Sequence, residues 1–219
     1  MTTVRDTEIK RLRDLELLIQ EIPNYEKPKL KLEQYVTDAN IAAVMLWDAH
    51  MRGYIRGQRV LDLGCGTGRF AIPAAILGAR HVLCIDIDPE AMAVVKKEIE
   101  KRKLTNIDLV ITDIRTLNLR GKFHVAFQNP PFGIWEGKGT DMAFLQKALE
   151  HSTVVYTIHK LSTMDHVINT VNQWGYTTEV LDKAVITIPP MYKHHRKKKH
   201  KVEVFIARIT PRNKELKSH

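Results

Sequence analysis

The sequence has few cysteines and no long apolar run, and each absence excludes a class of protein. No apolar stretch approaches the ~18 residues of a membrane-spanning helix, so we expect no membrane association. The first thirteen residues are too highly charged for the apolar core of a secretory signal. The only two cysteines, Cys65 and Cys84, lack a Cys-x-x-Cys spacing. We therefore expect no disulfide framework, no metal site and a reducing, cytoplasmic compartment.

Acidic residues are outnumbered, and most of the excess positive charge lies in one segment. The net charge is +9, and residues 193–201 carry six Lys or Arg and no acid. Without these six side chains the net charge is only +3. Such a patch is typical of polyanion binding, although a solvated loop or a nuclear-import signal is the alternative. The histidines at 194, 195 and 200 have no metal-ligand spacing and are interpreted as part of the same surface.

Apolar periodicity predicts a single α/β domain. Residues 1–57 form a helical extension with helices over 6–22 and about 38–52, residues 58–210 form the core, and 211–219 form a flexible tail. In the core, predicted strands (60–63, 81–87, 107–111, 123–128 and 153–159) alternate with predicted helices (70–77, 89–103, 140–151 and 165–174). This alternation predicts a parallel sheet covered on both faces. Residues 177–188 and 202–209 should form an antiparallel edge hairpin with the basic run at its tip, giving seven strands in all.

A glycine-rich turn, residues 62–68 (Asp-Leu-Gly-Cys-Gly-Thr-Gly), follows the first predicted strand. Glycines there permit a tight turn and close approach of a ligand to the backbone. Asp86 ends the next strand, where a carboxylate can bind the ribose hydroxyls of an adenosine cofactor. Asp113 ends the third strand and would face the adenine amino group, although a lone strand-end aspartate is more often a turn residue. The spacing differs from the nicotinamide pattern, and Asp62 suits a methionine ammonium better than a pyrophosphate, which favours S-adenosylmethionine over NAD.

The sharpest motif is Asn129-Pro130-Pro131-Phe132, directly after the fourth strand. Two prolines give a stiff extended backbone without N–H donors, so the Asn129 amide oxygen and the Pro130 carbonyl remain as acceptors. Two fixed acceptors can orient an exocyclic amine, and Phe132 offers an aromatic face for a base. A neutral amine needs no strong base before it attacks, so such a site contributes alignment and electrostatics. A Pro-Pro turn followed by a core phenylalanine is the alternative.

These motifs resemble known families. The glycine turn resembles the first motif of Rossmann-like methyltransferases, and the tetrapeptide resembles the fourth motif of enzymes that methylate amino groups of adenine, cytosine or glutamine. More specifically, the chain is similar over residues 10–209 to the methyltransferase-like-five family of ribosomal RNA adenine-N6 methyltransferases. That similarity rests on residues 25–30, 32–35, 129–133, 138–145 and 158–160, and on the late basic run.

The resemblance implies methylation of one adenosine in small-subunit ribosomal RNA and a Rossmann-like class I fold. It also implies a small zinc-binding activator protein that adds a strand to the sheet. The implied catalytic residues are Asn129, Pro130, Pro131 and Phe132. The implied cofactor-binding residues are Gln34, Thr37, Asp62, Gly64, Gly66, Thr67, Gly68, Arg69, Asp86, Ile87, Asp113 and Ile114, with Gln34 and Thr37 at the methionine end. The expected RNA-binding residues are His159, Lys160, Lys193, Arg196, Lys197, Lys198 and Lys199.

Three other functions stay open on the sequence. A protein-glutamine methyltransferase would use the same tetrapeptide, but a basic patch does not favour it. A non-catalytic RNA-binding assembly factor would not need the intact tetrapeptide together with the acids Asp62, Asp86 and Asp113. A DNA adenine methyltransferase commonly needs a separate target-recognition region, for which this chain has little room, although either nucleic acid must unstack its target base.

Overall fold

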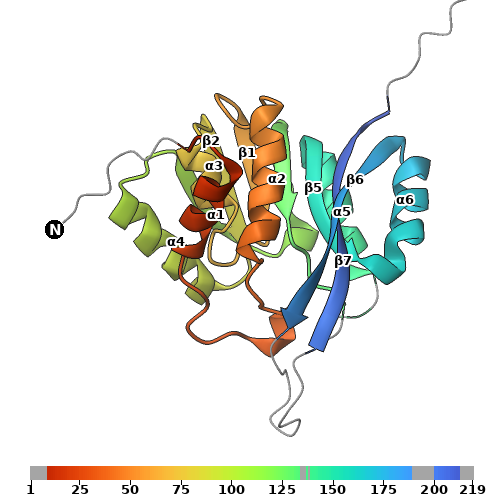
Figure 1. The fold of residues 1–219 in the computed structure, drawn as a ribbon, viewed down its shortest axis with the longest axis horizontal. Coiled ribbons are helices and arrows are strands. Elements are labelled where there is room, and N and C mark those ends of the chain that lie inside the picture. The colour runs from red at the N-terminus through yellow and green to blue at the C-terminus, as the bar shows by residue number, and fades with distance from the viewer. Residues whose placement is uncertain (1–8, 134–136, 138, 189–199, 213–219) are drawn as a thin grey trace, which may run out of the picture.

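The computed structural model describes residues 9–133, 137, 139–188 and 200–212. It is built around one seven-stranded sheet with the order β3-β2-β1-β4-β5-β7-β6 (Figure 1). The strands are β1 (Arg59–Leu63), β2 (His81–Asp86), β3 (Ile107–Ile111), β4 (Phe123–Gln128), β5 (Ser152–Lys160), β6 (Tyr176–Ile188) and β7 (His200–Pro211). The helices are α1 (Leu12–Gln20), α2 (Ala39–Met51), α3 (Ala71–Ile76), α4 (Pro89–Arg102), α5 (Thr140–His151) and α6 (Met164–Gln173), with short 3-10 turns η1 (Leu30–Leu32), η2 (Ile114–Thr116) and η3 (Leu161–Thr163).

The first five strands are parallel, and β7 runs antiparallel between β5 and β6. This confirms the predicted seven-stranded, mostly parallel sheet with an antiparallel hairpin. The last strand of the chain is, however, inside the sheet, and β6 forms the edge. Strand order reverses between β1 and β4, and ligands bind beyond the carboxyl ends of strands at such a point.

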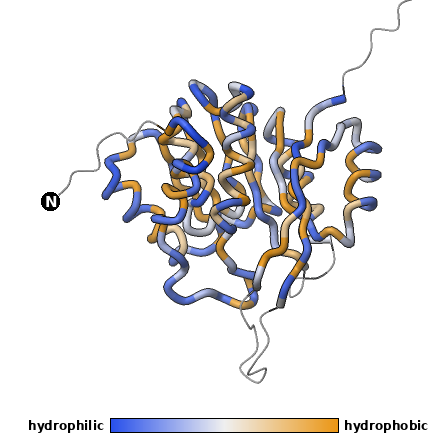
Figure 2. The backbone as a smooth tube through the Cα atoms, viewed as in Figure 1, coloured by the Kyte–Doolittle hydropathy of each residue, from blue (hydrophilic) through white to orange (hydrophobic). Residues whose placement is uncertain are grey.

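Alternate residues of the strands build two hydrophobic cores, one on each face of the sheet. Val60 packs into the core that contains residues of α1, α2, α3 and α4, whereas its neighbour Leu61 packs with α5 and α6. The helices follow the same division, as α6 shows with Val167 and Val171 buried beneath an outer side that is largely hydrophilic (Figure 2). Among the described residues, no helix is both long and apolar enough to cross a membrane.

Most predicted boundaries agree with the structure to within a residue or two, because local capping signals fix them. Asp38 begins α2 by accepting a hydrogen bond from the Asn40 N–H at 2.9 Å. The first helix begins only at Leu12, although its prediction from residue 6 falls partly outside the described residues. The predicted flexible tail begins too early: Pro211 is part of β7, and the Arg212 guanidinium contacts Asn172 of α6 at 3.2 Å. Residues 213–219 lie outside the described residues.

The expectation of no disulfide is wrong, because Cys65 and Cys84 are bonded to each other. Cys65 lies in the turn after β1, and its N–H donates to the Ile85 carbonyl of β2 at 3.0 Å. The β1-α3-β2 crossover thereby brings the two cysteines to a Cα–Cα distance of 5.7 Å although they are 19 residues apart in sequence. The pairing comes from the crossover, so no short cysteine spacing reveals it.

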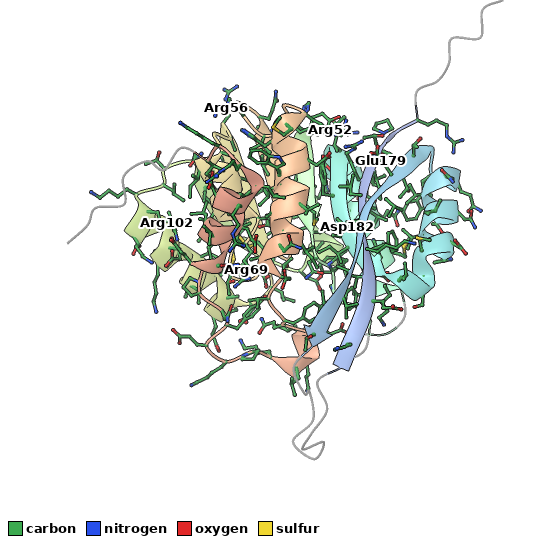
Figure 3. The ribbon with its side chains drawn as sticks, viewed as in Figure 1. Arg52, Arg56, Arg69, Arg102, Glu179 and Asp182 are labelled. Carbon is green, nitrogen blue, oxygen red and sulfur yellow. A yellow bond between two sulfur atoms is a disulfide. The ribbon has the colours of Figure 1, made fainter. Side chains whose placement is uncertain are left out.

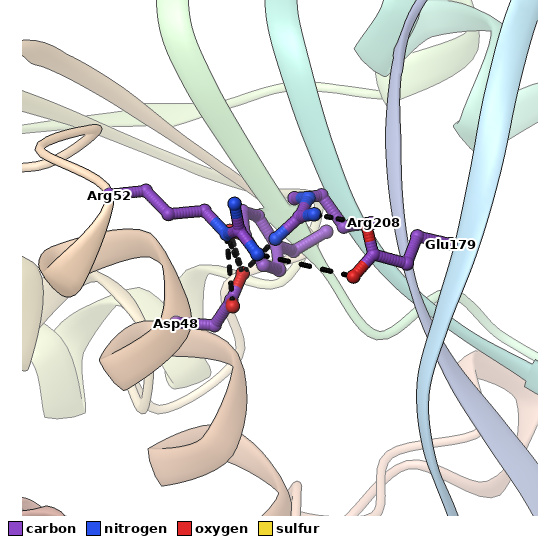
Figure 4. Close-up of polar contacts among 5 residues, drawn as sticks. Asp48, Arg52, Glu179 and Arg208 are labelled. Carbon is purple, nitrogen blue, oxygen red and sulfur yellow. Dashed lines mark hydrogen bonds and ion pairs between the residues drawn. The ribbon is translucent and has the colours of Figure 1, made fainter.

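A network of charged side chains fixes α2 against the antiparallel part of the sheet (Figure 4). The buried Arg208 of β7 donates to Asp48 of α2 at 2.6 Å and also to Glu179 of β6. Asp48 further accepts from Arg52 at 3.0 Å and from the Tyr156 hydroxyl at 2.5 Å. Buried charges are stable only when paired, so this network defines how the N-terminal extension sits on the core.

Candidate active site

The carboxyl ends of β1, β2, β3 and β4 meet the segment before α2 in one pocket. Most of the predicted cofactor-binding residues line it, namely Gln34, Thr37, Gly64, Gly66, Thr67, Arg69, Asp86, Ile87, Asp113 and Ile114. Asn129 and Pro131 of the predicted catalytic tetrapeptide line the same pocket. Cofactor-type and catalytic residues, which are far apart in the sequence, therefore share one cavity.

The glycine turn closes tightly over the end of β2. Gly66 has a left-handed backbone (φ +52°), and its N–H donates to the Asp86 carboxylate at 2.8 Å. The Tyr25 hydroxyl lies so close that a Cβ on Gly66 would be 2.1 Å from it. Gly68 does not line the pocket; a Cβ there would press against Ile72 at 3.0 Å, so this glycine lets α3 pack close to the turn.

Asp62 lies beneath the glycine turn and not in the pocket lining. Asp62 is fully buried, does not line the pocket, and accepts a hydrogen bond from the Ala71 N–H at the start of α3 at 2.8 Å. Burial raises the pKa of Asp62 to about 8, and the nearby Asp86 adds to the shift. The second oxygen, Oδ1, is buried and has no hydrogen-bond partner among the described residues, so the contact to a methionine ammonium, directly or through water, stays a prediction.

Asp86 is positioned to accept hydrogen bonds from a ligand. Its two oxygens already accept the N–H groups of Gly66, at 2.8 Å, and Asp88, at 2.9 Å, and each retains acceptor capacity. Burial raises the pKa of Asp86. Asp88 is a second, buried acid that holds the N-terminal extension, since its carboxylate accepts from Lys29 and from Gln34, both at 2.6 Å.

Asp113 lines the pocket as predicted, but its carboxylate has a protein partner. Both oxygens accept from the Arg115 guanidinium, at 2.6 to 3.0 Å, and these hydrogen bonds lower the pKa of Asp113. Asp113 also caps η2 through the Arg115 N–H at 2.9 Å. A contact between Asp113 and an adenine amino group would have to share the carboxylate with Arg115 or replace it.

The side chain of Asn129 is held in one orientation. Its Nδ2 donates to the Thr37 hydroxyl oxygen at 3.0 Å. The amide oxygen Oδ1 is buried and finds no hydrogen-bond partner among the described residues. A buried acceptor without a partner costs free energy unless a ligand satisfies it, so Oδ1 is a candidate ligand-binding atom.

The other half of the tetrapeptide is covered by residues of the extension. The Phe132 N–H donates to the buried Glu33 carboxylate at 2.6 Å, and its carbonyl accepts from the Lys160 ammonium at 3.0 Å. The Tyr35 ring stacks on Phe132 with centroids 5.4 Å apart, and the Tyr35 hydroxyl donates to the Pro130 carbonyl at 3.5 Å. The aromatic face and the second acceptor predicted to be open are therefore occupied by Tyr35.

Residues 33–37, which we call the strap, contact the tetrapeptide through every second side chain: Glu33, Tyr35 and Thr37. Gln34 turns the other way and binds Asp88. Arg69, labelled in Figure 3, fastens the end of the strap to the glycine turn, because its guanidinium donates to the Thr37 carbonyl at 2.8 Å. Gln34, Thr37 and Arg69 thus hold the protein together at positions where the sequence predicted cofactor contacts.

The predicted RNA-binding residues divide into three groups. His159 is fully buried between Asp141, at 3.0 Å, and Thr157, at 3.0 Å, so the expectation that its side chain contacts RNA is wrong. Lys160 lies beside the tetrapeptide, because its ammonium donates a hydrogen bond to the Phe132 carbonyl. Lys193, Arg196, Lys197, Lys198 and Lys199 lie outside the described residues.

The sequence motifs did not single out several residues of the site, among them Tyr25, Glu33, Tyr35, Asp88 and Arg115. Tyr25 and Glu33 fall in stretches that resemble the methyltransferase-like-five family, which was the available signal. Asp88 is followed by a proline that opens α4, a capping pattern that conceals its second role in binding Lys29 and Gln34. For Arg115 no sequence signal pointed to the pocket.

The pocket fits S-adenosylmethionine in its donor and acceptor chemistry. Asp86 offers carboxylate oxygens for ribose hydroxyls, and Ile87 and Ile114 offer apolar surface for an adenine ring. The Thr67 hydroxyl is buried and, among the described residues, unpaired. With Asp62 beneath the turn, no described acid other than Asp86, Asp113 and Glu33 lines the pocket.

Comparison with known proteins places these observations in a family. Residues 60–151 match the methyltransferase domain model. The chain is 38% identical over 205 residues to the rRNA N(6)-adenosine-methyltransferase METTL5 of Danio rerio, covering 92% of this chain and 99% of that one. The Drosophila melanogaster protein of the same name is 34% identical, over 89% of this chain and 93% of its own length.

A solved structure shares the fold over its whole length. It is a Pyrococcus horikoshii protein provisionally assigned as an RNA methyltransferase, with a TM-score of 0.82 and 32% identity over 98% of this chain and 100% of that chain. The predicted fold class and family are both confirmed. The chain belongs to the METTL5 family of rRNA N(6)-adenosine-methyltransferases.

Proposed function

We propose that the protein methylates the N6 amino group of one adenosine in small-subunit ribosomal RNA, with S-adenosylmethionine as the methyl donor. The observation that carries the proposal is the buried Oδ1 of Asn129, which has no partner in the described part of the chain and lies in the same pocket as the glycine turn and Asp86. The names of the METTL5 relatives give the substrate class.

The protein contributes orientation to this reaction. Asn129 Oδ1 accepts one N–H of the target amino group, and Thr37 keeps the amide from rotating, because it holds Nδ2 at 3.0 Å. S-adenosylmethionine, when bound, supplies an electrophilic methyl group on a sulfonium. Since the neutral amine is the nucleophile, the residues around it need only align its lone pair with the methyl group. The bond from sulfur to the methyl group would break as the new N–C bond forms, the neutral thioether would leave, and the methylated nitrogen would then lose one proton to solvent.

The direct test is methylation of unmodified small-subunit ribosomal RNA, followed by digestion to nucleosides and mass spectrometry. We expect N6-methyladenosine from the wild-type protein and from an Asn118→Ala control at an exposed asparagine, but none from Asn129→Ala. Product on a protein glutamine or on DNA, with none on RNA, would contradict the proposed substrate. Failure to bind S-adenosylmethionine would favour the alternative of a non-catalytic RNA-binding assembly factor.

We also propose that Lys160 and the basic run at residues 193–199 form a rim for RNA phosphates. Support comes from the six cations between residues 193 and 201 and from the position of Lys160 beside Phe132. Neutralising residues 196–199 should weaken RNA binding and reduce its salt dependence, because each lost phosphate contact removes counterion release. Four lysines at α4, Lys96, Lys97, Lys101 and Lys103, provide a control with the same change in charge. Unaltered RNA affinity in the 196–199 variant would refute the rim.

For the small zinc-binding activator expected from the family, we propose docking at β3. This strand is an edge of the sheet, and its Ile111 is 56% exposed. An exposed apolar edge is suited to pairing with another strand. Ile111→Lys should abolish co-purification with such a partner, whereas Val185→Lys, at a position that is also 56% exposed but on the opposite edge strand β6, should not. Co-expression without any gain in solubility or activity would remove the proposal.

A further inference from the structure

Tyr35 occupies the contacts that a target adenine needs. Its ring lies on Phe132 with an angle of 28° between the planes, and its hydroxyl points to the Pro130 carbonyl. Tyr35 lines the described pocket, whereas Phe132 and Pro130 do not. A ligand entering this pocket therefore meets Tyr35 before it can reach the aromatic face or the second acceptor of the tetrapeptide.

The side chain matches the chemistry of the target base. Adenine is a flat aromatic ring with an N–H donor at its edge, and tyrosine is a flat aromatic ring with an O–H donor at its edge. Burial raises the pKa of Tyr35, with a further contribution from Glu33, so its hydroxyl stays protonated and remains a donor. The ring and donor of Tyr35 thus face the groups that would bind the ring and donor of adenine.

The contacts of Tyr35 are weaker than those of its neighbours in the strap. Its hydrogen bond to Pro130 is 3.5 Å long, at the limit for such a bond, whereas Glu33 holds Phe132 at 2.6 Å and Thr37 holds Asn129 at 3.0 Å. The backbone is thus fixed on both sides of Tyr35, while the Tyr35 side chain is held by its stack on Phe132 and by partial packing against the core, without a short hydrogen bond.

We infer that Tyr35 is a placeholder for the target adenosine, displaced when the flipped base enters; this inference rests on the proposed function. The ring fills the base site in the free protein and keeps it closed to water. Displacement lowers the apparent affinity for RNA, because only the fraction of molecules with Tyr35 moved away can bind the base. A permanent wall of the base pocket would act in the opposite direction, since its removal would weaken binding.

The KM for RNA, measured for Tyr35→Ala at saturating S-adenosylmethionine, distinguishes a placeholder from a permanent wall of the base pocket. A placeholder predicts a KM about threefold to tenfold lower than that of the wild type, because the aromatic stack no longer competes with the base. Tyr35→Phe keeps the stack and should stay within about twofold of the wild type. A KM that rises or does not change in Tyr35→Ala overturns the inference.

A second measurement does not depend on a folded alanine variant. With 3-fluorotyrosine incorporated throughout, the fluorine resonance of Tyr35 should shift when unmodified ribosomal RNA is added. The resonance of Tyr54 serves as the control. The Tyr54 ring packs on His124, with the two ring centroids 5.5 Å apart, and not on the tetrapeptide. A Tyr35 resonance that does not move at saturating RNA contradicts displacement. If the proposed function fails, neither wild type nor variant forms N6-methyladenosine; if only the placeholder fails, product forms and the KM values disagree with the expectation.

Discussion

Replacing Thr37 with valine tests how the proposed catalytic residue, Asn129, is oriented. The Thr37 hydroxyl is the acceptor for Asn129 Nδ2 at 3.0 Å, and valine has the same shape without an acceptor. A hydrogen bond of this kind contributes about 0.5–1.5 kcal/mol, so its loss should lower the population of the productive amide orientation about twofold to tenfold. We expect kcat to fall by that factor. The Arg69 contact to the Thr37 carbonyl, at 2.8 Å, remains, so the strap should stay in place.

The assay is steady-state methylation of RNA together with calorimetric titration of S-adenosylmethionine. Thr37→Ser keeps the hydroxyl and should retain wild-type kcat. Thr170→Val on α6, whose hydroxyl bonds only locally to the His166 carbonyl at 2.8 Å, controls for the same chemical change elsewhere. If Thr37→Val weakens cofactor binding and leaves kcat unchanged, Thr37 acts on the methionine end of the cofactor and the orientation argument is refuted.

Further predictions concern the glycine turn. Because burial raises the pKa of Asp62 to about 8, the folded protein retains a proton that the unfolded chain has lost, and stability falls as the pH rises from about 4 through 8 by up to ~1.4 kcal/mol per unit. Asp62→Asn should flatten this fall in urea unfolding at pH 5 and 8, and equal declines in both proteins would contradict it. Gly66→Ala should abolish cofactor binding, because its Cβ would collide with Tyr25. Gly57→Ala, at a similar positive φ but with open space around the Cβ, should not. Equal cofactor affinities of the two variants would show that the turn can move to accommodate the Cβ. Reduction of the disulfide, which spans 19 residues, should lower the free energy of unfolding by about 3 kcal/mol, and identical denaturation curves with and without reductant would argue against a stabilising bond.

The sequence was sufficient for the fold because each strand carries a local signal. Short apolar runs such as residues 107–111 and 123–128 alternate with helical patterns, and this alternation determines a doubly wound sheet. Capping residues then fix the boundaries, as Asp38 does for α2. The position of β7 inside the sheet was missed although a signal was present: residues 204–209 of β7 are all buried, whereas among the described side chains of β6 only Ile186 is.

The site was predictable in its motifs and unpredictable in its long-range contacts. Glycine spacing and strand-end acids located the pocket, since the topology brings those strand ends together. The partners of Asn129 and Phe132, in contrast, are 92 and 99 residues away in the strap, and no periodicity encodes them. Asp62 shows the same limit: its carboxylate bonds beneath the turn, a direction that the motif does not specify.

The strap provides a physical link between the cofactor side and the catalytic side of the pocket. The carboxylate of Asp86, a predicted ribose ligand, accepts a hydrogen bond from the Asp88 N–H at 2.9 Å. The Asp88 carboxylate in turn accepts one from the Gln34 side-chain amide at 2.6 Å. From Gln34 the strap continues to Thr37, whose hydroxyl oxygen accepts a hydrogen bond from the Asn129 amide at 3.0 Å. A ligand that shifts one end of this hydrogen-bonded chain changes the geometry at the other end, and the two binding events are thereby coupled. On this reasoning, S-adenosylmethionine should change the affinity for the target adenosine, and RNA should change the affinity for the cofactor by the same factor.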